Sequence, residues 1–248
     1  MTAPRREVSP DAGALAATVA TALLERLAAV QAEGREPHVG LTGGTIAEAI
    51  HREVARLASD AGVDFARVVF WFGDERFVAA DSPERNAGQA RAAFLDAVGA
   101  TQVHEVPSSD DAASVEEAAA AYGAALRAHG GGRFDVLMLG VGPDGHVASL
   151  FPGYPQLEAT DAIAVAVTDS PKPPAERVTL TFEALNHASA VWFLVSGDGK
   201  ADAVAQAWGG TATHPEPADA SAIPAVGVRG HDDTVWWLDE AAASLLSP

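Results

Sequence analysis

A glycine-flanked Asp-Gly-His turn is the segment of this chain best suited to acid–base chemistry. Asp144 and His146 stand two residues apart in Gly-Val-Gly-Pro-Asp-Gly-His, directly after the apolar run Val136–Leu139. A histidine can take up a proton near neutral pH, and a neighbouring carboxylate can fix its tautomer or assist it. We therefore predict that both residues are catalytic, with His146 as the general base and Asp144 as its partner.

The same turn also contains Gly-x-Gly-x-x-Gly after an expected strand, which is a dinucleotide-binding pattern. Its context disfavours that function. Pro143 lies inside the turn, Pro152 and Gly153 shorten any helix that follows, and no strand about 20 residues on ends in an acidic residue. We expect no dinucleotide here, and no cofactor elsewhere.

Three charged residues, Asp74, Glu75 and Arg76, follow the strongly apolar run Val68–Phe72. Charges at the carboxyl end of a strand belong either to a solvated loop or to a site. Arg76 can stabilise a developing oxyanion, and we predict that it is catalytic. Asp74 and Glu75 are predicted to support this loop and to contact the substrate. Asn86 begins the next expected helix, as a site residue or only as its cap.

Gly43, Gly44 and Thr45 form a turn between an expected strand and an expected helix. The glycines allow close approach to a ligand, and a helix N-terminus presents unpaired N–H groups to an anion. The turn is therefore a candidate phosphate seat. The alternative is a helix cap alone, because Thr45 and Glu48 have capping-box spacing. The Gly-Lys-Ser/Thr ending of a nucleoside-triphosphate loop is missing.

Cations are scarce in this chain, which has 16 Lys and Arg against 34 Asp and Glu and a net charge of −18. Such a surface repels nucleic acid and anionic lipid, so we expect neither as a partner. Arg177 and Lys200 stand beside turns, where they are either local anion-binding groups or ordinary surface charges. We predict that both bind the substrate.

Short apolar runs alternate with alanine-rich helical stretches along the chain. This alternation predicts a three-layer, Rossmann-like α/β fold, a mostly parallel sheet with helices on both faces, in a single domain over 1–248. Ligands then bind at the carboxyl ends of the strands. The expected strands are Val39–Leu41, Val68–Phe72, Val103–Val106, Val136–Leu139, Ile163–Val167, Val191–Val195, Ala225–Val228 and Val235–Leu238. The expected crossover helices are Ile46–Ala58, Asn86–Ala97, Ser114–Ala128 and Lys200–Trp208, and 209–224 is expected to be a loop.

The N-terminal stretch superficially resembles a signal peptide, because Arg5 and Arg6 precede an apolar segment. Its apolar residues recur at helical spacing, however, which favours an amphipathic first helix after Ser9-Pro10 over export. No apolar run approaches the roughly 18 to 20 residues that cross a bilayer. We expect a cytoplasmic protein, a monomer or weak homodimer, that contacts no membrane.

Other enzyme classes lack their characteristic residues. The chain has no Cys, and its eight His residues show no His-x-His or His-x-x-x-His spacing, so we expect no metal site. A Gly-x-Ser-x-Gly nucleophile elbow is also missing, which disfavours a serine hydrolase.

The order of these motifs resembles the 6-phosphogluconolactonase family over nearly the whole chain. The matching segments are Thr-Gly-Gly-Thr, Gly-Asp-Glu-Arg, Gly-Val-Gly-Pro-Asp-Gly-His-Val-Ala-Ser-Leu-Phe-Pro-Gly, Ser-Pro-Lys-Pro-Pro-x-x-Arg-Val-Thr-Leu-Thr and Ser-Gly-x-x-Lys. The related glucosamine-6-phosphate deaminases continue from Asp-Gly-His to a ring-opening Glu. Here Ser149-Leu150-Phe151 occupies that stretch, which disfavours deamination.

The resemblance implies a hydrolase that opens 6-phospho-D-glucono-1,5-lactone to 6-phospho-D-gluconate in the pentose phosphate pathway. In that role His146 activates water, Asp144 supports it and Arg76 stabilises negative charge. The Gly43-Gly44-Thr45 turn, Arg177 and Lys200 hold the phosphate. Two alternatives remain, an aminosugar-phosphate deaminase or isomerase and a non-enzymatic sugar-phosphate sensor, which would need the phosphate seat but not His146.

Overall fold

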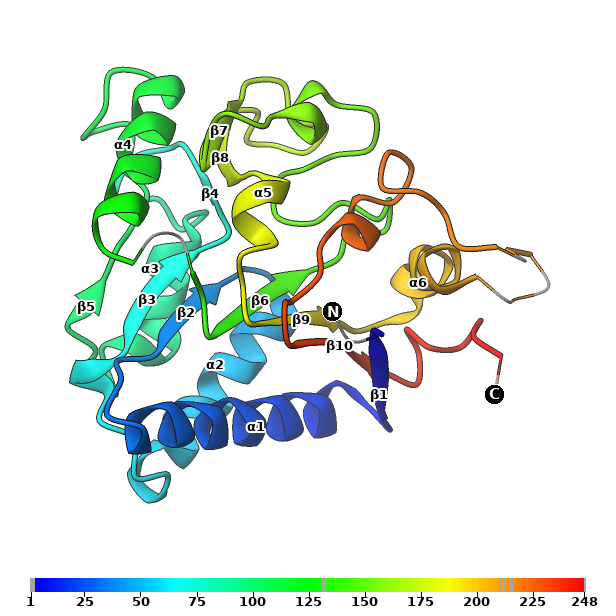
Figure 1. Ribbon diagram of the computed structural model, residues 1–248, viewed down its shortest axis with the longest axis horizontal. Coiled ribbons are helices and arrows are strands. Elements are labelled where there is room, and N and C mark those ends of the chain that lie inside the picture. Colours follow the sequence, from blue (N-terminus) through cyan, green and yellow to red (C-terminus); the bar gives the residue numbers. More distant parts are fainter. Residues whose placement is uncertain (1–2, 131–132, 210, 212, 215, 248) are drawn as a thin grey trace.

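Seven parallel strands form the central sheet of the protein, as a computed structural model shows (Figure 1). The structure describes residues 3–130, 133–209, 211, 213–214 and 216–247. The strand order across the sheet is β1-β10-β9-β6-β2-β3-β5. The strands span Arg5–Ser9 (β1), His38–Leu41 (β2), Val69–Phe72 (β3), Gln102–Val103 (β5), Val136–Gly140 (β6), Ala190–Val195 (β9) and Asp233–Asp239 (β10).

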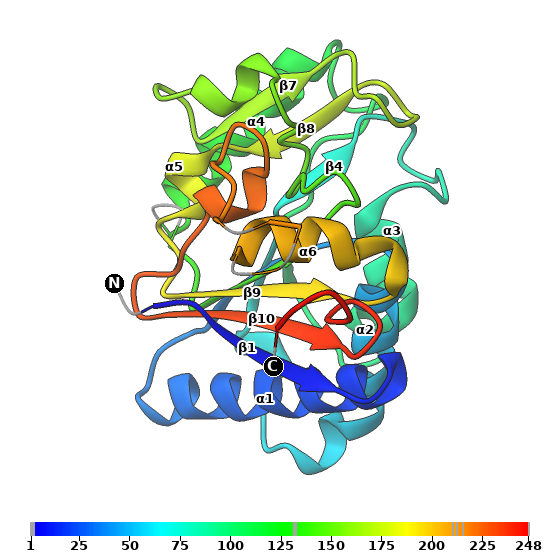
Figure 2. The same cartoon turned by 90° about the vertical axis from the view of Figure 1, so that its right-hand side faces the viewer.

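Both faces of this sheet are covered, and successive residues of its strands alternate between two cores. Phe70 and Met138 face the core built by the first two helices, whereas Trp71 and Leu139 face the opposite core. Figure 2 shows α1 on one side of β1, β9 and β10 and α6 on the other. The predicted three-layer, mostly parallel α/β fold is confirmed. Burial on both faces explains why the strands are continuous apolar runs.

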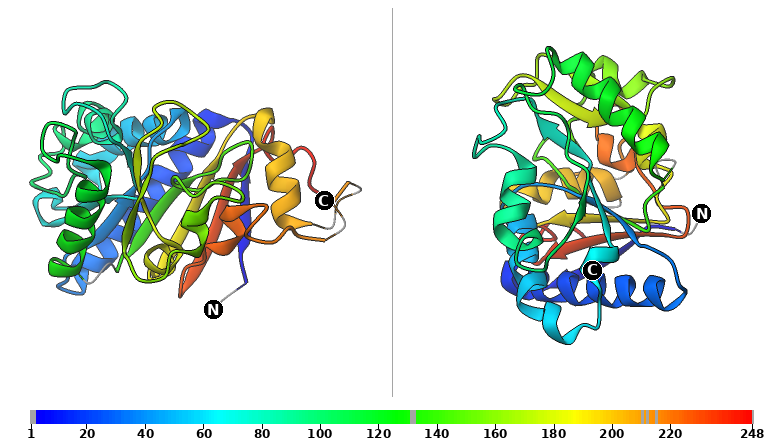
Figure 3. Two further views of the ribbon diagram at one scale, coloured as in Figure 1. Left: turned by 90° about the horizontal axis from the view of Figure 1, so that it is seen from above. Right: turned by 90° about the vertical axis from the view of Figure 1, so that its left-hand side faces the viewer.

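The helices follow the predicted crossovers closely. A π-turn at Arg91–Leu95 extends α3, and a 3-10 turn at Asp198–Lys200 precedes α6. Figure 3 shows how these helices surround the sheet when it is seen from above and from the side. The helices span Ala12–Ala32 (α1), Thr45–Leu57 (α2), Asn86–Ala90 (α3), Val115–Ala128 (α4), Phe182–Leu185 (α5) and Ala201–Trp208 (α6).

A second, antiparallel sheet of three strands lies on the side of the main sheet where α4 packs. Its order is β4-β8-β7, with β4 at Asp74–Arg76, β7 at Ala164–Val167 and β8 at Arg177–Leu180. The predicted strand at Ile163–Val167 therefore exists as β7, but it belongs to this small sheet and not to the parallel one. Through β4 and β8, the small sheet carries Arg76 and Arg177 towards the ends of the main strands.

The first helix forms after Ser9-Pro10, as predicted, but it is more apolar over its whole length than expected. By length and composition alone, α1 is the one helix in the described chain that could cross a membrane. In the structure Leu15, Val19, Leu23 and Leu27 on one side of α1 are fully buried in the core beneath the sheet. A helix that covers a sheet needs such an apolar face, so its hydropathy has a structural explanation.

Several predicted element boundaries are wrong. Ala225–Val228 is not a strand, because a 3-10 helix at Pro224–Gly227 occupies this segment and its Ala225 N–H donates to Gly145 O. The strand expected at Val103–Val106 ends at Val103, beyond which Val106 O accepts from Arg85. Strands β1, β4 and β8 were not expected. The loop expected over 209–224 contains residues 210, 212 and 215, which lie outside the described residues.

One fully buried histidine makes the stability of this fold sensitive to pH. His51 on α2 packs against Phe94, with ring centroids 4.7 Å apart, and its Nε2 has no hydrogen-bond partner in the described structure. Burial lowers the pKa of His51 from 6.5 to about 4. The folded protein therefore holds this imidazole neutral, while the unfolded chain binds a proton near pH 6.5.

We predict that the free energy of unfolding declines as the pH falls from about 6.5 to 4. His51 contributes its full stability above pH 6.5, and about 3 kcal/mol is lost by pH 4. In denaturant unfolding of His51→Leu, the free energy of unfolding should change less between pH 6.5 and 4 than it does in the wild type. The matched change at an exposed histidine, His187→Leu, should keep the wild-type slope. Equal slopes for the wild type and His51→Leu would contradict the prediction.

Candidate active site

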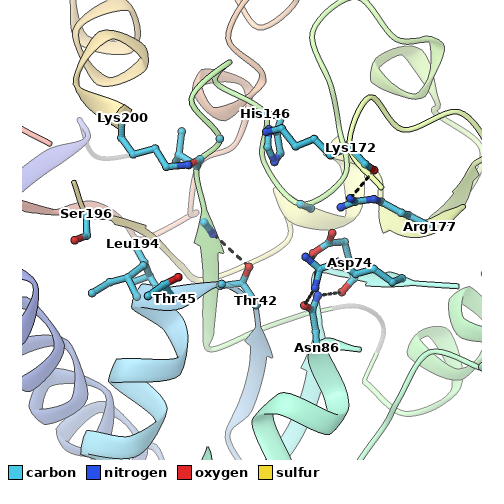
Figure 4. A pocket seen from close by; sticks show the side chains of 18 of the residues that line it. Thr42, Thr45, Asp74, Asn86, His146, Lys172, Arg177, Leu194, Ser196 and Lys200 are labelled. Atoms are coloured by element: carbon cyan, nitrogen blue, oxygen red, sulfur yellow. Dashed lines mark hydrogen bonds between the residues drawn. The ribbon is translucent and has the colours of Figure 1, made fainter. Parts of the chain in front are cut away.

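A cavity of about 580 Å³ opens where the main strands end (Figure 4). Its walls come from the segments that follow β2, β3, β6 and β9, together with β4 and β8 of the small sheet. The carboxyl ends of parallel strands meet at one edge, so this is the position that the fold predicts for a ligand. Its described lining residues include four cations and one carboxylate, namely Arg76, Lys172, Arg177, Lys200 and Asp74.

His146 reaches the cavity from a tight turn that only glycine permits. The Gly142 N–H donates to His146 O at 2.8 Å, and a Cβ on Gly142 would overlap the His146 ring and the Asp144 carboxylate. His146 Nδ1 lies 2.5 Å from Asp144 Oδ1. Because the carboxylate accepts at this position, Nδ1 carries the proton and Nε2 has a free lone pair. No hydrogen bond in the described structure involves Nε2.

Asp144 stands behind His146 as a charged partner. Partial burial raises the pKa of Asp144, but the hydrogen bond from His146 and the electrostatic influence of His146 and Lys172 outweigh this effect. The pKa of Asp144 is therefore well below its ordinary value. A carboxylate in this state stabilises an imidazolium on His146, which is the form that a general base takes after accepting a proton.

Arg76 is held at the cavity by the side chain of Asn86. The Arg76 Nη1 group donates to Asn86 Oδ1 and, at 3.0 Å, to Glu84 O. Asn86 Nδ2 in turn donates to Asp74 O at 2.9 Å. Asn86 is the first residue of α3, but Arg85 occupies the cap position. The cap-only interpretation of Asn86 is therefore wrong, because its side chain orients Arg76.

Glu75 is fully buried and does not line the cavity. Its carboxylate accepts from three backbone N–H groups, those of Arg76 at 2.8 Å, Asn86 at 2.8 Å and Ala87 at 2.9 Å. Burial raises the pKa of Glu75, and the three N–H donors and Arg85 act in the opposite direction. The structure thus places Glu75 as the anchor of the loop that carries Arg76, out of reach of a ligand.

The Gly43-Gly44-Thr45 turn borders the cavity at the start of α2. Gly44 takes the cap position with φ of 102°, and no side chain caps the first N–H groups. The capping-box alternative for Thr45 and Glu48 is therefore wrong. Gly43 is required because a Cβ there would overlap the Asn86 amide. The unpaired N–H groups at this end of α2 remain available to an anion.

Lys200 and Arg177 supply positive charge from different sides of the cavity (Figure 4). Lys200 Nζ donates to Val141 O at 2.8 Å, and burial, with the nearby charge of Lys172, lowers its pKa. Arg177 uses Nε and Nη2 to bind the carbonyls of 172–174. Burial also lowers the pKa of Arg177, although Asp74 acts against it. Both cations are thus partly shielded from water, where an anion would be attracted strongly.

All the predicted site residues line this cavity except Asp144 and Glu75. Sequence reasoning did not select Lys172, whose Nζ lies 3.3 Å from His146 Nδ1 and 3.5 Å from Asp144 Oδ1. It also missed Ser196, whose hydroxyl donates to Asp239 at 2.5 Å. Lys172 lies in Ser-Pro-Lys-Pro-Pro and Ser196 in Ser-Gly-x-x-Lys, two of the motifs shared with the lactonase family. Membership in these motifs could have identified both residues from the sequence. The described residues contain no group of three potential His, Asp or Glu metal ligands.

The fold and the cavity together define an α/β protein with an acid–base pair inside an anion-attracting site. Residues 10–237 match the family model described as glucosamine-6-phosphate isomerases/6-phosphogluconolactonase, and the chain belongs to this family. The resemblance noted in the sequence is therefore confirmed.

Curated relatives and a solved structure carry the name 6-phosphogluconolactonase. The protein of Streptomyces coelicolor is 40% identical over 98% of this chain and 95% of its own length. The human protein is 37% identical over 94% of this chain and 90% of its own. The solved structure from Trypanosoma brucei is 25% identical, with a TM-score of 0.83 and full coverage of both chains.

Proposed function

We propose that this chain hydrolyses 6-phospho-D-glucono-1,5-lactone to 6-phospho-D-gluconate, a step of the pentose phosphate pathway. The observation that carries the proposal is the His146–Asp144 pair with a free Nε2 in a cavity lined by four cations. The names of the curated relatives support the same substrate. An acid–base pair and an anion-binding wall are what a phosphorylated lactone requires.

The reaction begins with His146 as general base. Nε2 takes a proton from water while the water oxygen attacks C1 of the lactone, and the carbonyl becomes a tetrahedral oxyanion. Asp144 stabilises the imidazolium formed on His146. Collapse of the intermediate breaks the bond between C1 and the ring oxygen, and His146 returns its proton to that oxygen. The product acid then ionises in solution.

Arg76 stabilises the negative charge that develops on the C1 oxygen. Its guanidinium is preorganised by Asn86 and Glu84 O, so it does not need to be reoriented during the reaction. Donors fixed in advance in a partly dry site lower the barrier more than mobile ones. This role follows from the side chain being part of the cavity wall and tethered at one nitrogen.

Lys200 and the Gly43-Gly44-Thr45 turn bind the phosphate, and Arg177 adds positive charge from a different side of the cavity. Anchoring the phosphate holds C1 beside His146 and converts binding energy into orientation. Local donors also explain how a chain with net charge −18 captures an anion. The attraction comes from groups within the cavity, whereas the distant acidic surface is screened by salt.

The deaminase alternative finds less support at this site. After His146 the turn continues through Ser149, Leu150 and Phe151, and the latter two are buried apolar side chains. This segment therefore offers no carboxylate to open a sugar ring. Release of ammonia from glucosamine 6-phosphate is the assay that would favour a deaminase, and tight ligand binding without turnover would favour a sensor.

We predict that His146→Ala lowers kcat/KM about 100- to 10,000-fold, because the reaction then loses its general base. The lactone is generated in situ with glucose-6-phosphate dehydrogenase, and its loss is corrected for spontaneous hydrolysis. Circular dichroism should show that the fold is retained. The control His187→Ala, at an exposed histidine away from the cavity, should match the wild type. Wild-type turnover in His146→Ala would remove this residue from the mechanism.

Lys200→Ala should weaken capture of the phosphorylated lactone about 10- to 100-fold, the range expected for a lost charge-assisted hydrogen bond. Hydrolysis of unphosphorylated glucono-1,5-lactone should change little. The ratio of kcat/KM for the phosphorylated lactone to that for the unphosphorylated one should therefore fall. Arg56→Ala removes an exposed cation at the far end of α2 and serves as the control. An unchanged preference in Lys200→Ala would reject the phosphate assignment.

A further inference from the structure

A buried serine joins the turn that carries His146 to the strand that carries Asp74. Ser149 is 1% exposed, and its hydroxyl donates to Asp74 Oδ2 at 2.6 Å. Its backbone N–H donates to Thr179 Oγ1 at 3.1 Å. The two bonded residues belong to adjacent strands, β4 and β8, of the small sheet. Ser149 takes no part in the proposed hydrolysis steps.

The backbone beside Ser149 is held in an unfavourable conformation. Ala148 has φ of 50°, the left-handed region that residues other than glycine rarely enter. Val147 and Leu150 close the turn through reciprocal backbone hydrogen bonds. Strain of this kind persists only where neighbouring contacts enforce it. Ala148 directly precedes Ser149, whose hydroxyl reaches Asp74.

Asp74 is the single carboxylate among the described residues that line the cavity. Oδ2 is occupied by Ser149, and Oδ1 has only a long contact of 3.5 Å with Asn86 Nδ2. Oδ1 therefore keeps capacity to accept another hydrogen bond. The ligand groups that a carboxylate recognises in this way are neutral hydroxyls, as on a sugar ring.

A second group, the guanidinium of Arg177, attracts the carboxylate that Ser149 binds. The charges of Asp74 and Arg177 interact across the small sheet, and this interaction raises the pKa of Arg177 against the effect of burial. A carboxylate without a fixed partner would turn towards such a guanidinium, since the attraction is strong in a partly dry site. The short hydrogen bond from Ser149 keeps Asp74 in place.

We propose that Ser149 is a positioning residue that holds Asp74 ready to accept a hydrogen bond from a sugar-ring hydroxyl of the lactone. Asp74 then sets the orientation of the ring relative to His146, while the phosphate is bound elsewhere. This inference rests on the proposed hydrolysis. Two parts of the substrate are then bound by different residues. Asp74, held by Ser149, orients the sugar ring, and Lys200 binds the phosphate.

The test is a double-mutant cycle of Ser149→Ala and Asp74→Asn, assayed on phosphorylated and unphosphorylated glucono-1,5-lactone. Ser149→Ala should lower kcat/KM about ten-fold on both substrates, the scale of a hydrogen bond to a charged group. The fall should lie mainly in kcat, because phosphate capture is intact. In the Asp74→Asn background the same change should cost less than about two-fold.

Ser108→Ala is the matched control, since Ser108 is equally buried and donates to Asp111 at 2.7 Å away from the cavity. It should leave kcat/KM unchanged. Additive losses in the cycle would overturn the inference, because Ser149 would then support the turn without acting through Asp74. Full activity in Asp74→Asn alone would overturn it too, even if Ser149→Ala failed to fold. A wild-type protein without lactonase activity would instead reject the proposed function itself.

Discussion

The buried carboxylate of Glu75 is the constraint on which the site depends. A carboxylate without water is costly unless hydrogen bonds replace its hydration, and here three backbone N–H groups do so. Those donors belong to the residues on either side of the β4–α3 connection, which is therefore fixed at both ends. The hydrogen bonds to Glu75 fix the backbone of Arg76 and Asn86. The Asn86 side chain in turn donates to the backbone carbonyl of Asp74. This side of the pocket is therefore held in place by hydrogen bonds within the protein itself.

The sequence alone predicted most of the central parallel strands and the site residues that follow them, because buried parallel strands have a regular apolar pattern. Strands β2, β3, β6 and β9 are buried on both faces, so each consists mainly of apolar residues, and a polar residue follows within four positions. Because parallel strands place those ends at one edge, motifs more than a hundred residues apart were expected to meet. His146 and Asp144 were paired correctly because they lie on one short turn.

The parts that escaped prediction depend on contacts between distant segments. Strands β4 and β8 are short and begin with charged or polar residues, so neither shows an apolar run. Glu75 resembles any exposed acid until the fold buries it. The contact of Ser149 with Asp74 spans 75 positions, and no local pattern announces it. Val103–Val106 and Ala225–Val228 had the residue preferences of strands, but the first pairs with β3 only at its start and the second lies mostly in a 3-10 helix.

The pairing of β1 with β10 has a consequence for how the protein is made. Arg5 in β1 contacts Asp233 in β10, 228 positions later in the chain. At ribosomal rates of about 5 to 20 residues per second, the N-terminal strand waits roughly ten to fifty seconds for its partner. During this interval the apolar residues of α1 that pack against β10 in the folded protein have no partner there. This edge of the sheet therefore closes only once β10 has been synthesised, and apolar surface near β1 stays exposed until then.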